Sequence, residues 1–326
     1  MTCLSNSFIK KCARETGFDL CGIVRPKEVS FPHHTMDKWL AEGKHAGMDW
    51  LTRNNCLRRN PALLTEDAAS IIVCGIGYLR QTHAPGIARY AQGKDYHFVI
   101  KNMLGELLQK LNCSGQLVSG RCFTDSAPIA ERYWAVEAGL GWIGRNGLLI
   151  NRQKGSFLLL GELIINCKTD TYDTPNPFNG CGNCRRCIDN CPGKALDGQS
   201  PLDARRCTSY LTIEHKKPFT KTEQDILRRS RPFFFGCDIC QEICPWNKKA
   251  IREITPEISE KTSALFSSDE YNFSLTLSEW LALDEEQFRQ YKKTPLSRPG
   301  LENLKRNIIA STDNLTLPET SESLQT

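Results

Sequence analysis

Sixteen cysteines set this 326-residue chain apart, and seven of them fall into two short runs whose spacing suits metal-bound thiolates. The first run has the pattern C-x2-C-x2-C-x3-C-P and contains Cys181, Cys184, Cys187 and Cys191. The second run, C-x2-C-x3-C-P, is one cysteine short and contains Cys237, Cys240 and Cys244. Cys207 lies between the runs and can provide the missing thiolate. Bacterial ferredoxins use this pattern to hold iron–sulfur clusters.

The spacing also predicts how the thiolates divide between two clusters. A cubane needs four thiolates, a C-x2-C-x2-C loop wraps three of its corners, and the cysteine before proline reaches the other cluster. One [4Fe–4S] cluster is therefore predicted on Cys181, Cys184, Cys187 and Cys244. The second is predicted on Cys191, Cys207, Cys237 and Cys240.

Zinc sites and disulfides are the alternatives to clusters. Zinc ribbons pair two C-x2-C motifs without the third cysteine and without the following proline. Disulfide frameworks belong to oxidising compartments, and the N-terminal residues show no secretory signal pattern. The other eight cysteines are expected to be small buried hydrophobic residues: Cys3, Cys12, Cys21, Cys56, Cys74, Cys113, Cys122 and Cys167.

Composition narrows the class of protein. The chain has 42 basic and 37 acidic residues, for a net charge of +5, and 40% of its residues are hydrophobic. No apolar run of about 18 residues is present, so no membrane span is expected, and we expect a cytoplasmic protein. The modest positive charge permits a nucleic-acid partner without requiring one.

Hydrophobic periodicity divides the chain into zones. Helical spacing is expected over residues 7–16, 36–54, 95–111 and 128–138, and buried strands over 70–75 and 156–165. These elements predict a layered α/β domain over residues 1–168. A turn-rich stretch then leads into a ferredoxin-like double-cluster domain over 169–250. A helical region over 251–310 and a disordered tail over 311–326 complete the prediction.

Two clusters form a short electron-transfer chain, which implies a redox centre in the N-terminal domain. Asp125 stands out there because it precedes Pro128, which can open a helix. It is either an N-cap or a catalytic acid. The glycine-rich segment 139–147 allows either close approach to a flat group or a tight turn. Its G-x-G-x-x-G string follows a helix, so the dinucleotide-binding context is missing.

The succession of motifs resembles the epoxyqueuosine reductase family. The matching segments are GMDWL at 47–51, RRNP at 58–61, DSAP at 125–128, GLGWIGRN at 139–146 and CPWN at 244–247. The resemblance covers about residues 5–250, with a weaker patch over 294–307. Some members carry HEAT-like repeats after the clusters, and this chain has room for only a short helical remnant.

The resemblance implies a cobalamin in the N-terminal domain beside the clusters. It implies reduction of epoxyqueuosine to queuosine at the tRNA wobble position, with Asp125 as the proton donor, its pKa raised by burial near Phe123. The residues carried over for the cobalamin site are Arg58 (with Arg59 as a rival), Tyr96, His97, Asp125, Leu149, Leu160, Ser209 and Glu214. For His97 the alternative is an ordinary helix-face histidine.

A tRNA substrate requires phosphate contacts. The candidates are basic residues of the C-terminal half: Lys216, Lys217, Arg228, Arg229, Arg231, Lys248, Lys249 and Arg298. An unidentified electron donor is also required, and a monomer is expected. The competing functions are a reductive dehalogenase, which usually carries a twin-arginine signal that this sequence lacks, and an iron–sulfur electron carrier or a cobalamin carrier without a substrate of its own.

Overall fold

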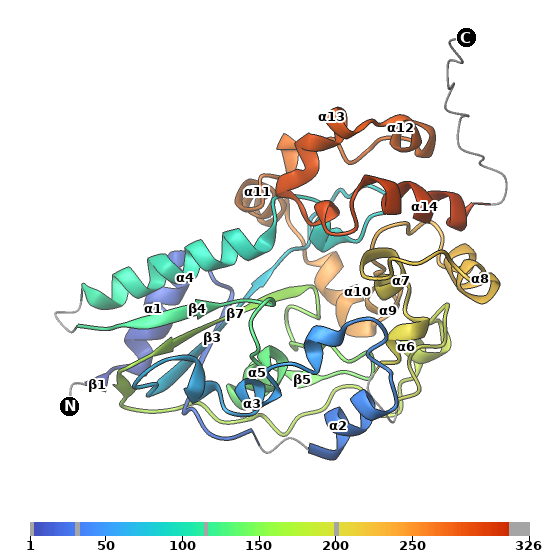
Figure 1. The fold of residues 1–326 in the computed structure, drawn as a ribbon. Coiled ribbons are helices and arrows are strands. Elements are labelled where there is room, and N and C mark those ends of the chain that lie inside the picture. Colours follow the sequence, from blue (N-terminus) through green and yellow to red (C-terminus); the bar gives the residue numbers. More distant parts are fainter. Residues whose placement is uncertain (1–2, 30–32, 114–116, 199–201, 313–326) are drawn as a thin grey trace, which may run out of the picture.

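The computed structural model describes residues 3–29, 33–113, 117–198 and 202–312 (Figure 1). The strands are β1 (Cys3–Leu4), β2 (Leu20–Val24), β3 (Ser70–Gly77), β4 (Gly120–Phe123), β5 (Trp142–Ile143), β6 (Leu149–Ile150), β7 (Leu158–Ile165) and β8 (Lys168–Thr169). The helices of the first half are α1 (Asn6–Thr16), α2 (His33–Ala41), α3 (Asn55–Arg59), α4 (Tyr96–Asn112) and α5 (Glu131–Glu137). The later helices are α6 (Arg186–Asp189), α7 (Thr208–Ile213), α8 (Lys221–Arg229), α9 (Ile239–Glu242), α10 (Pro245–Arg252), α11 (Pro256–Leu265), α12 (Leu277–Ala282), α13 (Glu285–Phe288) and α14 (Leu301–Ser311).

A four-stranded sheet in the order β2-β3-β7-β4 forms the centre of the N-terminal half. Every neighbouring pair in this sheet is antiparallel. The β-branched run of β3 and the leucine-rich run of β7 are the two inner strands, as expected for segments that are apolar throughout. Glu162 interrupts the apolar run of β7 and lies between Val73 of β3 and Phe123 of β4.

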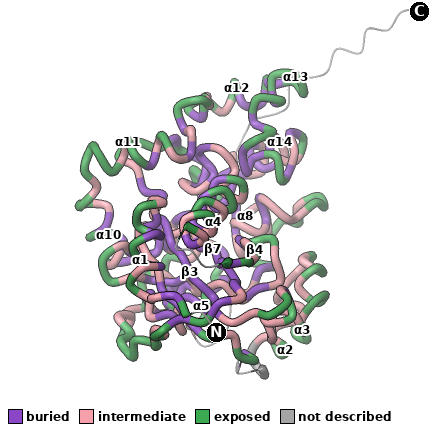
Figure 2. Tube along the Cα trace, turned by 90° about the vertical axis from the view of Figure 1, so that its left-hand side faces the viewer, coloured by how far each residue is buried: buried purple, intermediate pink, exposed green. Residues whose placement is uncertain are grey.

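Helices cover both faces of this sheet, which gives the layered α/β arrangement that the sequence predicted (Figures 1 and 2). On one face, α1 and α4 pack against the sheet through residues such as Ile9, Ile100 and Leu104. On the other face, α5 packs through Trp134 and Ala135. Figure 2 shows that the strands β3 and β7 are buried along most of their length, whereas the outer turns of the helices are exposed.

The C-terminal helices share a core with two earlier segments of the chain. The buried residues of α12, α13 and α14 pack against Ile87 and Ala91, and against Phe234 and Phe235. Gly86 makes this contact close, because a Cβ there would overlap the Phe234 ring. The region after the clusters therefore packs onto both the N-terminal half and the cluster-bearing segment.

The structure corrects two predictions from the sequence. The helix expected over 36–54 ends at Ala41, because Gly43 and Ala46 adopt positive φ angles of 64° and 53°, which a right-handed helix cannot contain. The expected burial is wrong for Cys3, Cys56 and Cys113, which are exposed. The strands expected over 70–75 and 156–165 are confirmed, with β7 beginning two residues late.

Two further expectations concern the ends and the surface. The predicted tail over 311–326 lies outside the described residues from 313 onward. No helix in the described ranges combines the length and the hydropathy needed to cross a bilayer.

Candidate functional site

The first predicted set of cysteines lines one cavity. Cys181, Cys184, Cys187 and Cys244 face a space of about 230 Å³ whose rim also contains Arg145 and Trp246. Burial, followed by the charges of the other three thiols, raises the pKa of Cys187 to about 11. A metal centre removes this cost, since thiolates that bind a metal lose their protons. The donor set and the cavity thus fit a [4Fe–4S] cluster.

The second predicted set also comes together, although its members are spread over 50 positions of sequence. Burial raises the pKa of Cys240, and the charges of Cys237, Cys207 and Cys191 raise it further. Cys191, from the first run, therefore lies with the second set, as the crossed assignment requires. The backbone N–H of Ala195 donates to Cys191 Sγ at 3.3 Å, the kind of contact that tunes cluster sulfur ligands.

Single zinc ions are the metal sites that the sequence left as an alternative for these thiols. A lone zinc ion at about 2.3 Å from each sulfur would bring its thiolates within roughly 4 Å of one another. Across the residues that the structure describes, no three His, Cys, Asp or Glu side chains are grouped tightly enough for one ion. Four thiolates around a cubane stand farther apart than this.

Buried contacts fix the loop that carries Cys244. Asn247, which is fully buried, accepts from the Ser156 backbone N–H at 2.6 Å and donates to the Gln241 carbonyl at 2.8 Å. Trp246 packs edge-on against Trp142, with ring centroids 5.1 Å apart. These contacts join the cluster segment to the start of β7 and to the β5–β6 hairpin.

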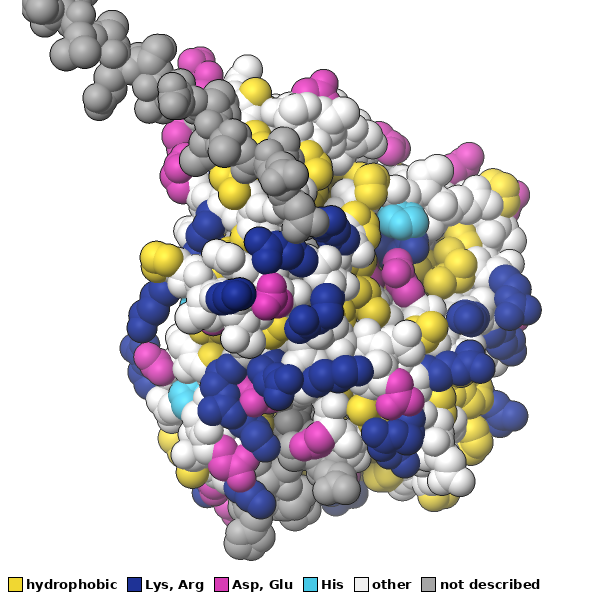
Figure 3. Space-filling view, turned by 90° about the vertical axis from the view of Figure 1, so that its right-hand side faces the viewer, with side chains coloured by type: hydrophobic (Ala, Val, Ile, Leu, Met, Phe, Trp, Pro, Cys, Tyr) yellow, Lys and Arg dark blue, Asp and Glu magenta, His cyan; other side chains and the backbone are white. Residues whose placement is uncertain are grey.

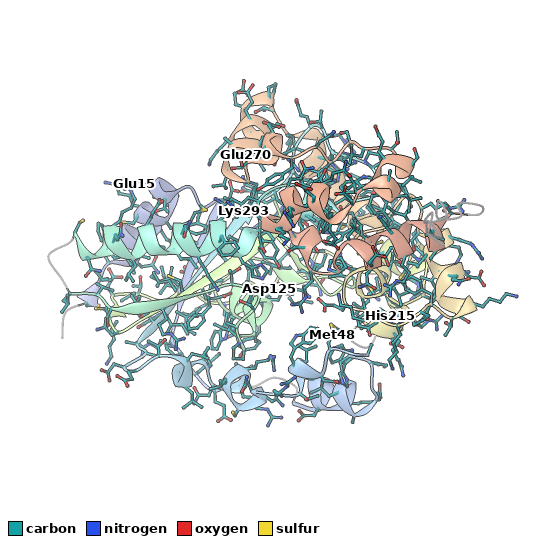
Figure 4. All side chains as sticks on the ribbon, turned by 45° about the horizontal axis from the view of Figure 1, so that its top comes forward. Glu15, Met48, Asp125, His215, Glu270 and Lys293 are labelled. Carbon is teal, nitrogen blue, oxygen red and sulfur yellow. The ribbon has the colours of Figure 1, made fainter. Side chains whose placement is uncertain are left out.

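A second constellation surrounds Asp125, in the loop after β4 (Figure 4). The Tyr96 hydroxyl donates to Asp125 Oδ2, and His97 Nε2 lies 3.2 Å from the same oxygen. Asp95 is the N-cap of α4 and holds His97 Nδ1 at 2.6 Å. Because α5 begins only at Glu131, Asp125 does not cap that helix, and the N-cap alternative is wrong.

From the sequence, burial was expected to raise the pKa of Asp125, and in the structure this pKa is lowered instead. Burial does raise it, but hydrogen bonds from His97 and Tyr96 outweigh burial and lower the pKa. Burial would lower the pKa of His97, yet its bonds to Asp125 and Asp95 raise it to about 9. Asp125 therefore rests as a carboxylate beside a charged His97. Its side chain keeps 58% of its surface accessible, so an incoming group can reach the carboxylate.

Two further acids stand behind Asp125. The Asp125 backbone N–H donates to Glu131 Oε1, while Asp125 itself adopts a positive φ of 48°. Burial and the charge of Asp125 raise the pKa of Glu131 to about 7. Glu162 is fully buried, and neither of its carboxylate oxygens has a hydrogen-bond partner among the described residues. Sequence reasoning missed both residues, although one acid within the apolar run of β7 was a visible signal.

The residues carried over for the cobalamin site lie on several elements around Asp125. Leu149 and Leu160 are buried in the same core cluster, and the Thr124 hydroxyl beside Asp125 donates to the Leu160 carbonyl at 2.8 Å. Ser209 follows Cys207 in α7, and Glu214 ends that helix. Of these residues, Tyr96 and His97 contact Asp125 directly.

The hydrogen bonds of Arg58 go to backbone carbonyls of a nearby loop. Its guanidinium donates to the carbonyl oxygens of Leu51 and Arg53 at 2.8 and 2.9 Å, which braces the loop that carries Trp50. The rival Arg59 pairs with Asp37 at 2.6 Å instead. Arg58 therefore supports the loop that carries Trp50.

Arg298, which the sequence offered as a phosphate contact, packs against Trp50 of the same loop. It pairs with Glu214 through two contacts of 3.0 and 3.2 Å, and its guanidinium lies 5.4 Å from the centre of the Trp50 ring. Trp50 remains 40% exposed. The bond to Glu214 and also the charge of Asp125 raise the pKa of Arg298, so the weak sequence patch near the C-terminus places an arginine near Asp125.

The glycine-rich segment forms a tight turn. Cβ atoms at Gly141 and Gly144 would overlap Ile150, across the β5–β6 hairpin, and Gly147 adopts a φ of 77°. Of the two alternatives that the sequence left open, the glycines therefore serve close packing of the hairpin.

The remaining basic candidates for phosphate contact lie at the surface. Lys and Arg side chains are spread over the face that carries α6 and α8 (Figure 3). Arg228, Arg229, Lys248 and Lys249 are exposed. Arg231 and Lys216 are exposed too, and they donate to the carbonyls of Ser311 and Arg298, as Arg229 does to that of Pro192.

Comparison with known proteins places these features in a family. The family model "Epoxyqueuosine reductase QueG, DUF1730" matches residues 58–126, and "4Fe-4S double cluster binding domain" matches 180–247. The epoxyqueuosine reductase of Cyclobacterium marinum is 38% identical over 92% of this chain and 94% of its own length. That of Leadbetterella byssophila is 35% identical over 92% of this chain and 96% of its own.

Solved structures give the same result. The epoxyqueuosine reductase of Streptococcus thermophilus aligns over 93% of this chain and 79% of its own, with a TM-score of 0.78 and 27% identity. An epoxyqueuosine reductase crystallised with an epoxyqueuosine-modified tRNA stem loop aligns with a TM-score of 0.77 and 25% identity, over 93% of this chain and 79% of its own. The chain therefore belongs to the epoxyqueuosine reductase family, oxidoreductases that use two [4Fe–4S] clusters and a cobalamin.

Proposed function

We propose that this chain reduces epoxyqueuosine to queuosine at the wobble position of tRNA, with electrons passing through two [4Fe–4S] clusters to cobalamin and with Asp125 as the proton donor. The single observation that carries the proposal is the constellation of Tyr96, His97 and Asp125 in the loop after β4, in a chain that also brings together two sets of four cysteines. The family resemblance over the whole length of both relatives supports the substrate. A relative bound to an epoxyqueuosine-modified tRNA stem loop supports it further.

The arrangement of aromatic residues supports the direction of electron flow. A Cβ at Gly236, next to Cys237, would lie 3.6 Å from the Tyr90 ring. The Tyr90 ring in turn meets the Tyr96 ring edge-on, with centroids 5.9 Å apart. The second cluster would thus lie nearer to Asp125, and the first would receive electrons from a donor protein through its cavity.

Cobalamin, when bound, provides the cobalt centre at which two electrons reach the epoxide. The residues that would hold it are the apolar Leu149 and Leu160, which belong to the core beside Asp125, and the polar Tyr96, Ser209 and Glu214. The chain's own acid–base work falls to Asp125, which rests as a carboxylate and must take up a proton before it gives that proton to the opening oxygen. Tyr96 and His97 orient the carboxylate through their contacts with its Oδ2.

The test is conversion of epoxyqueuosine-containing tRNA by the anaerobically purified protein with cobalamin and a reductant. Mass spectrometry of the digested nucleosides should score the loss of one oxygen. Asp125→Asn should lower the rate by about 10²–10⁴-fold, the range of a general acid, with iron and cobalamin content unchanged. Ser126→Ala, next in the same loop, is the matched control and should convert normally.

Each part of the proposal can fail separately. No conversion by the wild-type protein would refute the reductase activity on this substrate. Full activity of Asp125→Asn would refute the proton-donor role alone. Conversion without added or bound cobalamin would refute the electron route.

A further inference from the structure

The cavity of the first cysteine set lies at the surface and is basic. Besides the cysteines it is lined by Arg145 and Arg186, and among the described residues no Asp or Glu side chain lines it. Arg186 and Pro245, which both line it, are exposed, so the cavity meets solvent. The Arg145 guanidinium donates to the Gly182 carbonyl at 2.9 Å, which holds it against the loop after the first cysteine. The cluster site is therefore approached past two positive charges.

An exposed aromatic side chain lies beside this cavity. Phe178 keeps 40% of its surface accessible. Its ring meets those of Trp142 and Trp246 edge-on, with centroids 5.2 and 5.9 Å apart. Trp246 lines the cavity, and Trp142 packs with Cys244 in one small core. The three rings thus form an apolar patch that begins at the surface and ends at the cysteines.

Further basic side chains border this patch. The Arg152 guanidinium lies 5.3 Å from the centre of the Phe178 ring, and Arg152 is exposed. Lys248, near the start of α10, is exposed as well. Asp189, the acid of α6, pairs with Arg185 at 3.5 Å. The entry face, as we call this part of the surface, consists of Arg145, Arg152, Phe178, Arg186 and Lys248.

An apolar centre with a charged border suits a transient protein partner of the opposite charge. Charged borders steer such a partner to its site and fix its orientation. Electron-transfer complexes are among the smallest protein interfaces, below about 1,200 Å². Electron transfer also slows steeply with distance, so the partner's own redox centre has to lie near its surface. The entry face therefore fits a small acidic electron carrier.

A tRNA is also an anion, but the entry face suits it less well. The nucleotide that reacts has to reach Asp125, and neither Asp125 nor its partners Tyr96 and His97 line this cavity. A phosphate contact needs basic side chains alone and gains nothing from four thiols beneath them. An electron carrier, by contrast, requires that its docking site lie over a metal centre.

We propose that the entry face is the docking site of a small acidic one-electron carrier protein, which reduces the cluster on Cys181, Cys184, Cys187 and Cys244. The inference rests on the proposed reductase function and names the class of electron donor that this function requires. Each docking event oxidises the carrier by one electron and reduces the cluster by one electron, without making or breaking a bond and without moving a proton. Two such events supply the two electrons that one epoxide reduction consumes.

The test is the rate at which a reduced plant-type [2Fe–2S] ferredoxin, a small acidic carrier of about −400 mV, reduces the anaerobically purified protein. Rapid-freeze electron paramagnetic resonance follows the loss of the [2Fe–2S] signal and the gain of the [4Fe–4S] signal. Arg152→Glu combined with Arg186→Glu should lower the second-order rate constant at least about tenfold at low ionic strength. Arg14→Glu is the matched control, because Arg14 is exposed on α1, far from α6 in Figure 1, and it should match the wild type.

Three further measurements separate docking from damage to the cluster. The difference between the double variant and the wild type should shrink as salt rises from about 0.1 to about 1 M, because the Debye length falls from about 10 to about 3 Å. Arg186→Lys keeps the charge and should keep most of the wild-type rate. Photoreduction by neutral 5-deazariboflavin needs no docking protein, so its rate and the iron content should be alike in all variants. Line broadening of ¹⁵N-labelled oxidised ferredoxin should show weaker binding to the oxidised double variant.

Several outcomes would overturn the docking site. These are no reduction of the wild type by ferredoxin, equal ferredoxin rates in the wild type and the double variant at low salt, and equal slowing of photoreduction in the double variant. If the double variant instead loses affinity for tRNA and is reduced normally by ferredoxin, the entry face contacts RNA and the proposal is wrong. None of these readings needs epoxyqueuosine. Failure of the wild type to convert the modified tRNA would therefore refute the reductase function, and the ferredoxin rates would still decide the docking site.

Discussion

Pairwise removal of cysteines would test which thiolates share a cluster. Cys191 belongs to the first run in sequence, but its thiol lies with Cys207, Cys237 and Cys240 in the structure. Replacing it by alanine, which offers no ligand, should therefore remove the second cluster and spare the first. The substitution removes one sulfur ligand, and the measured quantity is the number of iron atoms that remain bound per chain.

The structure fixes the expected counts. Two intact cubanes hold about eight irons per chain, and any single cluster variant should hold about four. Cys191→Ala combined with Cys237→Ala should also hold about four, because both residues serve the same cluster. Cys191→Ala combined with Cys181→Ala should hold almost none, because the two residues serve different clusters.

Iron and sulfide analysis of anaerobically purified variants measures these counts, and electron paramagnetic resonance of the reduced proteins shows which cubane remains. Cys113→Ser is the control, since Cys113 is exposed and outside both sets, and it should retain about eight irons. Retention of about four irons in the Cys181 and Cys191 double variant would refute the crossed assignment. Loss of all iron in the Cys191 and Cys237 double variant, with four retained in each single variant, would refute it equally.

Three substitutions test other parts of the structure. Gly86→Ala should cost about 2–4 kcal/mol of stability, from overpacking against Phe234 and from an alanine held at a φ of 85°, and thermal unfolding should report a lower Tm with an unchanged far-UV spectrum. Asn247→Ala leaves the Ser156 N–H without its buried acceptor, so a loss of about 2–4 kcal/mol and faster iron loss to a chelator are expected, and unchanged iron retention would contradict the role of this network. His97→Gln should remove stability that is fully present below pH 6.5 and fades as pH rises through about 9, because the folded protein raises the pKa of His97 to about 9. The shift corresponds to at most about 3 kcal/mol, and Tm curves of variant and wild type should converge above pH 9, whereas a constant difference would refute the charged histidine.

Predictions from the sequence agreed best with the structure where they depended on the local spacing of residues. Cysteine runs have fixed ligand spacing, so the two sets of four thiols could be written from the sequence, and the structure brings the same residues together. Apolar runs that are buried on both faces likewise predict the inner strands β3 and β7. The helix predicted over 36–54 failed because apolar periodicity does not register a glycine turn within an otherwise helical pattern.

The charge states of the active site needed the folded chain. From the sequence, Asp125 was expected to have a raised pKa through burial, but the bonds from Tyr96 and His97 lower it. Those partners are about 30 positions away, and only the packing of α4 across the sheet brings them to the loop after β4. Arg298 illustrates the same limit, because the sequence offered it as a phosphate contact and the fold commits it to Glu214.

By itself, then, the amino-acid sequence predicted which cysteines come together, the buried strands and the family, because each depends on residue type and local spacing. Only the tertiary structure decided which acid carries charge and which carries a proton. A pKa depends on distance and burial in three dimensions, and these arise from contacts between residues far apart in the chain. Glu162 shows the division most clearly: the sequence places one acid in an apolar strand, and the fold leaves it buried without a partner behind Asp125.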